Sequence, residues 1–145
     1  MTTDDEVTSS NATGLFKVKT DLRGIIRPDH LIFSDLDSGF TVIVAEGVGG
    51  TMEPKKRFVL TFPRKDSYVT SDARDLVEVK YDDWSDMYDF QYSVESGSVT
   101  VSYEESPRAT IGMFNLVMKI IPGNVPPGPE RLKISGFFLL NEKPA

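Results

Sequence analysis

Acidic residues are the side chains of this sequence most concentrated in one stretch. Seven carboxylates lie between Asp72 and Asp89, against only two basic residues, Arg74 and Lys80. Carboxylate oxygens are the ligands that calcium prefers in proteins. Four of these residues are therefore calcium candidates, namely Asp82, Asp83, Asp86 and Asp89. A run of carboxylates is also typical of a solvated surface, and this is the interpretation that we favour for the sequence.

A second carboxylate pattern begins at Asp35. Together with Asp37 and Glu46, it has the spacing of the first, third and twelfth positions of a helix–loop–helix calcium loop. That loop needs glycine at its sixth position, where this chain has Phe40, and the residues after Phe40 alternate as in a strand. We therefore expect a β-turn here and no calcium site.

Nucleophilic catalysis has little support in the sequence. The single histidine, His30, lies close to Ser34 and Asp35, but no serine stands in a Gly-x-Ser-x-Gly motif. We expect His30 to lie in an exposed turn. The sequence has no cysteine, which excludes disulfides, thiolate metal sites and cysteine nucleophiles. We predict no catalytic residues, no cofactor and no enzymatic activity.

Charge and hydropathy narrow the classes of partner. The chain holds 16 basic and 22 acidic residues, a net charge of −6. An acidic surface repels phosphate, so we expect neither a nucleic-acid partner nor an anionic membrane surface. No apolar run approaches the roughly 20 residues of a membrane helix, and no signal peptide is visible, which favours the cytoplasm or a virion. A protein partner or self-association is the expected interaction.

Two short segments could serve binding. Trp84 and Tyr88 lie among the aspartates and could stack on a sugar ring, although a single tryptophan is more often a packing residue. The segment Pro54-Lys-Lys-Arg57 is read as a basic loop that offsets the acidic stretch.

The distribution of apolar residues predicts an all-β fold. Short runs with alternating apolar residues recur about every ten residues and are separated by Gly, Pro, Asn and Asp. The expected strands are 15–20, 40–46, 57–62, 76–81, 88–94, 98–104, 113–121 and 131–140. We predict an antiparallel, Ig-like or related β-sandwich of about eight strands over residues 15–145. Residues 1–14 are expected to form a flexible acidic tail.

Two connections stand out in this pattern. Alternation on both sides of Glu95-Ser-Gly97 predicts a β-hairpin with a three-residue loop. The segment Pro122–Pro129 holds four prolines, so it is expected to be a stiff connection between the last two strands.

Three C-terminal segments resemble the end of the N-terminal β-sandwich domain of transglutaminases: Val99–Tyr103, Pro107–Leu116 and Phe137–Asn141. In that family a strand leads into an Ala-Pro-Ile-Gly turn, another strand and a final Phe-x-Leu-Leu-Phe-Asn. This chain departs from the pattern at Thr110, where the family has proline, and at Glu142, where the family continues with Pro-Trp-Cys. The resemblance implies an Ig-like, non-catalytic domain, because the family's cysteine nucleophile has no counterpart here.

The sequence therefore predicts a non-catalytic β-sandwich that binds another protein or takes part in an assembly. A structural subunit of a coat or tail is the first alternative, since a polar N-terminal arm and a Pro-rich loop are features by which such subunits reach neighbours. A calcium- or glycan-binding module that uses residues 82–89 is the second alternative.

Overall fold

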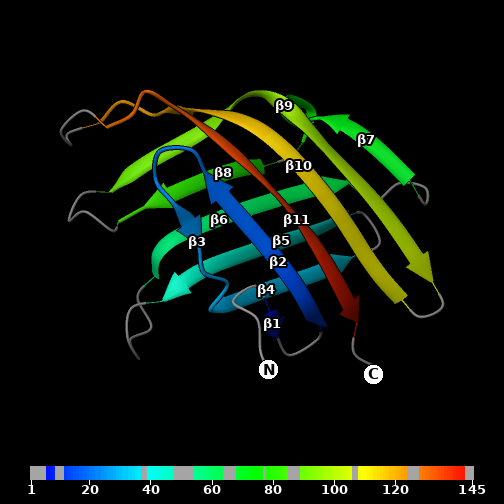
Figure 1. Ribbon diagram of the computed structural model, residues 1–145. Helices are drawn as coiled ribbons and strands as arrows, with labels where there is room; N and C mark the ends of the chain where they lie inside the picture. The colour runs from blue at the N-terminus through cyan, green and yellow to red at the C-terminus, as the bar shows by residue number, and fades with distance from the viewer. Residues whose placement is uncertain are drawn as a thin grey trace.

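The fold is one curled, antiparallel β-sheet (Figure 1). The computed structural model describes residues 6–8, 12–36, 39–47, 54–63, 68–76, 78–84, 89–105, 108–123 and 128–142. The elements are β1 (Glu6–Thr8), β2 (Ala12–Thr20), β3 (Ile25–Ile26), β4 (His30–Leu36), β5 (Gly39–Gly47), β6 (Pro54–Pro63), β7 (Tyr68–Asp72), the short 3-10 helix η1 (Ala73–Asp75), β8 (Glu78–Asp83), β9 (Phe90–Glu105), β10 (Arg108–Ile120) and β11 (Arg131–Glu142). Within the described ranges, η1 is the only helical segment, and it is far shorter than a bilayer-spanning helix.

The strands follow the order β1-β2-β11-β10-β9-β8-β6-β5-β4, while β3 pairs with β2 and β7 with β9. Figure 1 shows β2, β11 and β10 crossing over β8, β6, β5 and β4. The prediction of an all-β antiparallel fold is confirmed. Because β8 and β9 are hydrogen-bonded to each other, the two halves belong to one continuous sheet rather than to two separate ones.

The core lies between the two halves of the curled sheet. Phe58 of β6 stacks on Phe114 of β10 with ring centroids 5.1 Å apart, so the halves pack directly on each other. Leu116 of β10 and Leu132 of β11 are also buried, whereas Asn115 is exposed. The alternation of apolar and polar residues therefore predicts correctly which faces of these strands are buried.

The segment Glu95-Ser-Gly97 is a β-bulge inside one strand, and the predicted hairpin is wrong. β10 pairs with β9 on both sides of this segment. Val117 lies opposite Ser96, but Met118 lies opposite Val94, so Glu95 is an extra residue on β9.

The bulge explains why the sequence resembled a hairpin. Before it, Phe90 and Tyr92 are buried, and after it, Val99 and Val101 are buried. The inward positions thus change from even to odd numbers, which a one-residue bulge and a hairpin loop both produce. At Gly97, φ is +124°, and an added Cβ would lie 2.2 Å from the Asn115 carbonyl oxygen. This backbone conformation favours glycine.

Four strands were not predicted, namely β1, β3, β4 and β7. Strand β4 has apolar residues on both faces: Leu31 and Phe33 are buried, whereas Ile32 is 56% exposed. This lack of alternation hides the strand from pattern reading. His30, expected in a turn, is the first residue of β4.

Part of the expected N-terminal tail belongs to the sheet. β1 pairs with β2, whose first residue, Ala12, is fully buried. Residues 1–5 and 9–11 lie outside the described residues. Residues 37–38 of the predicted turn, residues 48–53, and residues 124–127 in the middle of the Pro-rich connection also lie outside them.

Candidate functional site

The calcium candidates Asp82 and Asp83 are adjacent in β8 and both fully buried. Neighbouring residues of a strand point to opposite faces, and the two carboxylates indeed bind different partners, Arg57 and Arg23. The expected solvated surface is therefore wrong for these two residues. It holds for Asp75 and Glu78, which are exposed.

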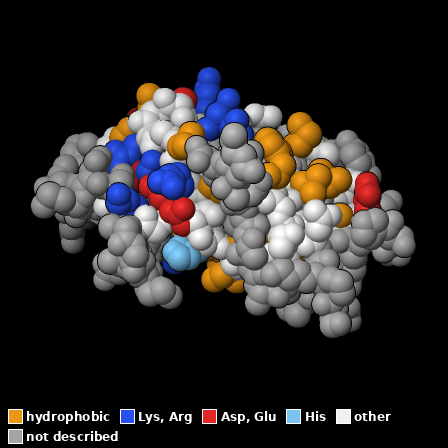
Figure 2. Space-filling view, turned by 60° about the horizontal axis from the view of Figure 1, so that its bottom comes forward, with side chains coloured by type: hydrophobic (Ala, Val, Ile, Leu, Met, Phe, Trp, Pro, Cys, Tyr) orange, Lys and Arg blue, Asp and Glu red, His pale blue; other side chains and the backbone are white. Residues whose placement is uncertain are grey.

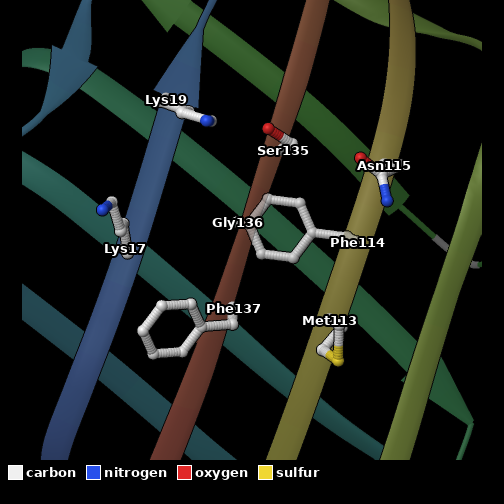
Figure 3. Close-up of a pocket in the computed structure, with 8 residues that line it drawn as sticks. All are labelled: Lys17, Lys19, Met113, Phe114, Asn115, Ser135, Gly136 and Phe137. Carbon is white, nitrogen blue, oxygen red and sulfur yellow. The ribbon is translucent and has the colours of Figure 1, made fainter.

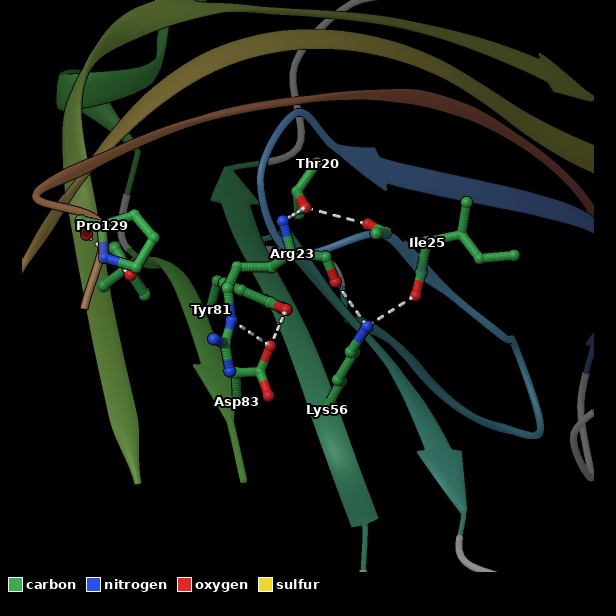
Figure 4. Close-up of polar contacts among 9 residues, drawn as sticks. Thr20, Arg23, Ile25, Lys56, Tyr81, Asp83 and Pro129 are labelled. Carbon is green, nitrogen blue, oxygen red and sulfur yellow. Dashed lines mark hydrogen bonds and ion pairs between the residues drawn. The ribbon is translucent and has the colours of Figure 1, made fainter. Parts of the chain in front are cut away.

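Asp83 belongs to a polar network inside the curled sheet (Figure 4). Arg23 Nε and the Tyr81 hydroxyl donate to the same Asp83 oxygen, Oδ2, over 3.0 and 2.7 Å. The Arg23 guanidinium also lies over the ring of Phe90, 4.8 Å from its centroid. Burial, together with the hydrogen bond to Asp83, raises the pKa of the Tyr81 hydroxyl well above its usual range. Tyr81 therefore acts as a hydrogen-bond donor here and not as a general base.

The backbone that carries Arg23 is fixed by Lys56 of β6. Lys56 Nζ donates to the carbonyl oxygens of Arg23 and Ile25 over 2.6 and 3.0 Å (Figure 4). The predicted basic loop from Pro54 to Arg57 is thus part of a strand, and Lys56 is buried. This network holds the turn after β2 against β6 and β8, which is a structural role.

Asp82 lies on the other face of β8. Arg57 Nη2 donates to its Oδ2 over 2.8 Å, Lys80 Nζ lies 3.9 Å from Oδ1, and the Arg57 guanidinium lies over the ring of Trp84, 5.3 Å from its centroid. Arg57 thus does offset acidic charge, as expected for the basic segment. Trp84 is half-buried beside Arg57 instead of lying in the core.

The remaining candidates for calcium or sugar binding are Asp86, Tyr88 and Asp89. Asp89 Oδ2 accepts from Gln91 Nε2 over 2.8 Å. The other carboxylate oxygen, Oδ1, is buried in both Asp82 and Asp89 and has no hydrogen-bond partner among the described residues. Asp86 and Tyr88 lie outside the described residues. Among the residues that are described, no three histidine, aspartate or glutamate side chains form a metal-binding group. The structure therefore separates Asp82 from Asp83 and pairs each of them with arginine.

His30 and Ser34 do not form a catalytic pair. They are four residues apart in β4, which corresponds to about 13 Å along a strand and exceeds hydrogen-bond reach. Figure 2 shows the histidine beside acidic and basic side chains on one side of the visible face. His30 is exposed, and its neighbour Asp29 accepts a hydrogen bond from the Gly47 amide over 3.0 Å.

A different surface, on the outer side of β2, β11 and β10, combines apolar and basic side chains. Phe137 lies opposite Met113 on one side and opposite Lys17 on the other. Met113 is 61% exposed and Phe137 38% exposed. Lys19 and Lys133 are exposed on the same face. We call these five residues the basic–apolar face.

The centre of this face is an open groove of about 250 Å³ (Figure 3). Its lining comes from three neighbouring strands: Lys17, Lys19, Met113, Phe114, Asn115, Ser135, Gly136 and Phe137. The strands that form it show an unusual charge balance. β2, β10 and β11 hold six basic residues and one acidic residue, in a chain whose net charge is −6.

Sequence reasoning missed this face, although a signal for it was present. In the expected strand 113–121 the outward positions hold Met113 as well as Asn115 and Lys119, and in 131–140 they hold Phe137 as well as Lys133. Exposed apolar residues at outward positions, with only basic charges beside them, are that signal.

Comparisons with known proteins give no further constraint. No family model matches the chain, and no curated protein and no solved structure is significantly similar to it.

Proposed function

We propose that this chain is a non-catalytic module for protein interaction or assembly, and that it contacts its partner through the basic–apolar face. The observation that carries the proposal is the exposure of Met113 and Phe137 side by side on neighbouring strands. Water-exposed apolar side chains that cluster in this way are typical of contact surfaces. Aromatic residues and methionine are enriched in such interfaces.

The predicted sandwich fold and the predicted family relationship agree with this role, but the proposal does not depend on them. Packing of the two halves through Phe58 and Phe114 supports describing the curled sheet as sandwich-like, and an Ig-like relationship stays a prediction from the sequence. A relationship to the transglutaminase N-terminal domain would also imply a non-catalytic module. The cytoplasm or a virion remains the expected compartment.

The proposal is tested with the double variant Met113→Ser, Phe137→Ser. Sedimentation velocity over a range of concentrations reports self-association, and capture from a lysate of the source cells reports foreign partners. We expect the double variant to lose the association that the wild-type chain shows, while circular dichroism shows an intact fold. The matched control is Leu22→Ser with Ile32→Ser, which also removes two exposed apolar side chains, 61% and 56% exposed.

The proposal is wrong if wild type and the double variant show the same association state and retain the same proteins. It is also wrong if the control variant loses association to the same extent, because the contact would then depend on general surface hydrophobicity.

A further inference from the structure

We propose, building on the function proposed above, that the basic–apolar face binds an extended acidic segment of a partner protein. The segment carries carboxylates at alternate positions and an apolar side chain that enters the groove between Phe137 and Met113.

Charge complementarity is the first argument for an acidic partner. The six basic residues and one acidic residue of β2, β10 and β11 leave ten basic and twenty-one acidic residues for the rest of the chain. By sequence these three strands thus carry a net charge of +5, and the rest of the chain carries −11. Opposite charge on a partner would steer it to this face and away from the remaining surface.

The ammonium groups of this face have no ion-pair partner among the described residues, although Asp21 lies near Lys133 and accepts a hydrogen bond from its backbone amide. Within the described residues, Lys17, Lys19 and Lys133 form no ion pair. Elsewhere the molecule pairs its cations readily: Arg131 Nε, nearby on β11, lies 2.9 Å from Glu95 Oε1. We therefore expect these three exposed ammonium groups to be the ones that meet carboxylates of another molecule.

Strand geometry determines the spacing of the partner's carboxylates. Lys17 and Lys19 lie two residues apart on one face of β2, which corresponds to roughly 7 Å. An extended peptide repeats its side chains on one side with the same period. Carboxylates at every second position of such a peptide can therefore reach Lys17 and Lys19 together.

The groove supplies a site for an apolar side chain next to these charges. Phe137 lies opposite Lys17 in the register, and Met113 lies on the far side of Phe137. Methionine adapts its shape to different apolar partners. The groove of about 250 Å³ has room for one apolar side chain, and Ser135 and Asn115 beside it offer polar contacts.

A long polyanion fits this surface less well than a short acidic segment. A nucleic acid carries one charge per nucleotide along its whole length, and a membrane presents an anionic plane. Either would extend past β2, β11 and β10 toward the acidic remainder of the chain and be repelled there. A peptide of a few residues can stay within the basic–apolar face.

The test is fluorescence anisotropy with a short labelled peptide that has aspartate at alternate positions around one phenylalanine. The matched peptide has asparagine in place of each aspartate. We expect the acidic peptide to bind the full-length chain and the neutral peptide to bind at least about tenfold more weakly, which corresponds to about 1.4 kcal/mol. Binding should weaken as the salt concentration rises.

Variants then locate the site. Lys17→Glu with Lys19→Glu should weaken binding of the acidic peptide about tenfold or more, and Lys55→Glu, an exposed lysine on β6, should change it less than about twofold. Circular dichroism checks that each variant is folded.

The other occupants are outcomes that overturn the proposal. The proposal is wrong if the chain binds oligothymidylate or phosphatidylserine vesicles more tightly than it binds the acidic peptide. It is also wrong if the chain associates with itself and the lysine variants abolish that self-association. Equal binding of the acidic and neutral peptides overturns it as well. If only the lysine variants are without effect, while Met113→Ser with Phe137→Ser still abolishes association, the partner chemistry is wrong and the interaction module remains.

Discussion

At the scale of single residues, buried charge is the feature that most distinguishes this chain. Asp83 is fully buried and shares its Oδ2 between Arg23 and Tyr81. The side chain of Arg23 is only 11% exposed. Removal of one partner would take this ion pair away from the other charge in a poorly hydrated site.

We predict that Asp83→Asn lowers the free energy of unfolding by about 3–5 kcal/mol, because Arg23 stays buried and loses its ion pair with this carboxylate. Replacing both partners, by Arg23→Met with Asp83→Leu, should cost less than the single change. Urea denaturation measures the free energy of unfolding of the single and the double variant. Asp75→Asn, at an exposed aspartate of η1, is the control and should stay within about 0.5 kcal/mol. A loss no larger than that of the control would contradict a structural role for the network.

A second residue-scale prediction concerns the pH dependence of Glu95 in the bulge. The hydrogen bond from Arg131 holds the pKa of this carboxyl below its usual range. A pKa that is lowered by folding stabilises the native state at pH values above the unfolded-state pKa. This contribution is lost as the pH falls through the folded-state pKa.

Carbon-detected NMR titration should therefore find Glu95 below the usual glutamate pKa of about 4.3. In Arg131→Gln the value should move up toward it, because the main cause of the shift is removed. An unchanged Glu95 pKa in this variant would show that the ion pair does not form in solution.

At the scale of elements, the bulge in β9 determines which side chains reach the core. It lets one strand pair with β8 through residues 90–93 and with β7 through residues 98–102. Gly97 is the residue that allows this path, because its backbone lies against β10.

We predict that Gly97→Ala destabilises the fold by more than about 1 kcal/mol, because alanine disfavours a φ of +124° and its Cβ would meet the Asn115 carbonyl. Thermal and urea denaturation provide the measurement. Gly123→Ala is the matched control, since no atom lies within 4 Å of its added Cβ. Equal stability of the two variants would mean that the bulge has a different backbone conformation.

These elements also show what the sequence could and could not reveal. Alternation identified most strands and buried positions such as Phe114 and Leu116, because an exposed outer face makes the period visible. It failed for β4, where Ile32 breaks the alternation. It could not distinguish a bulge from a hairpin, because both change the inward positions from even to odd. The pairing of Arg23 with Asp83, 60 residues apart, depends on the tertiary fold and has no local signal.

At the scale of the whole molecule, β9 joins the two halves of the sheet. Its partners include β8 in one half and β10 in the other. The halves also pack on each other through the stacked rings of Phe58 and Phe114. We therefore expect the chain to unfold in one cooperative transition.

The fluorescence of the single tryptophan provides a direct measurement of this cooperativity of unfolding. Trp84 follows β8, so its fluorescence reports on that half, while far-UV circular dichroism reports on all strands. The two signals should give the same urea midpoint. Separate midpoints would show that the halves unfold independently.

The extra residue in β9 also limits how this chain can change in length during evolution. Deleting Glu95 would remove the bulge and leave every pair between β9 and β10 in place, so Phe90 and Tyr92 would still face the core. A second extra residue at the same place would have no partner on β10 either. Natural variants of this chain that differ in length between Val94 and Ser98 should therefore be shorter by one residue, whereas surface connections can accept changes of any length.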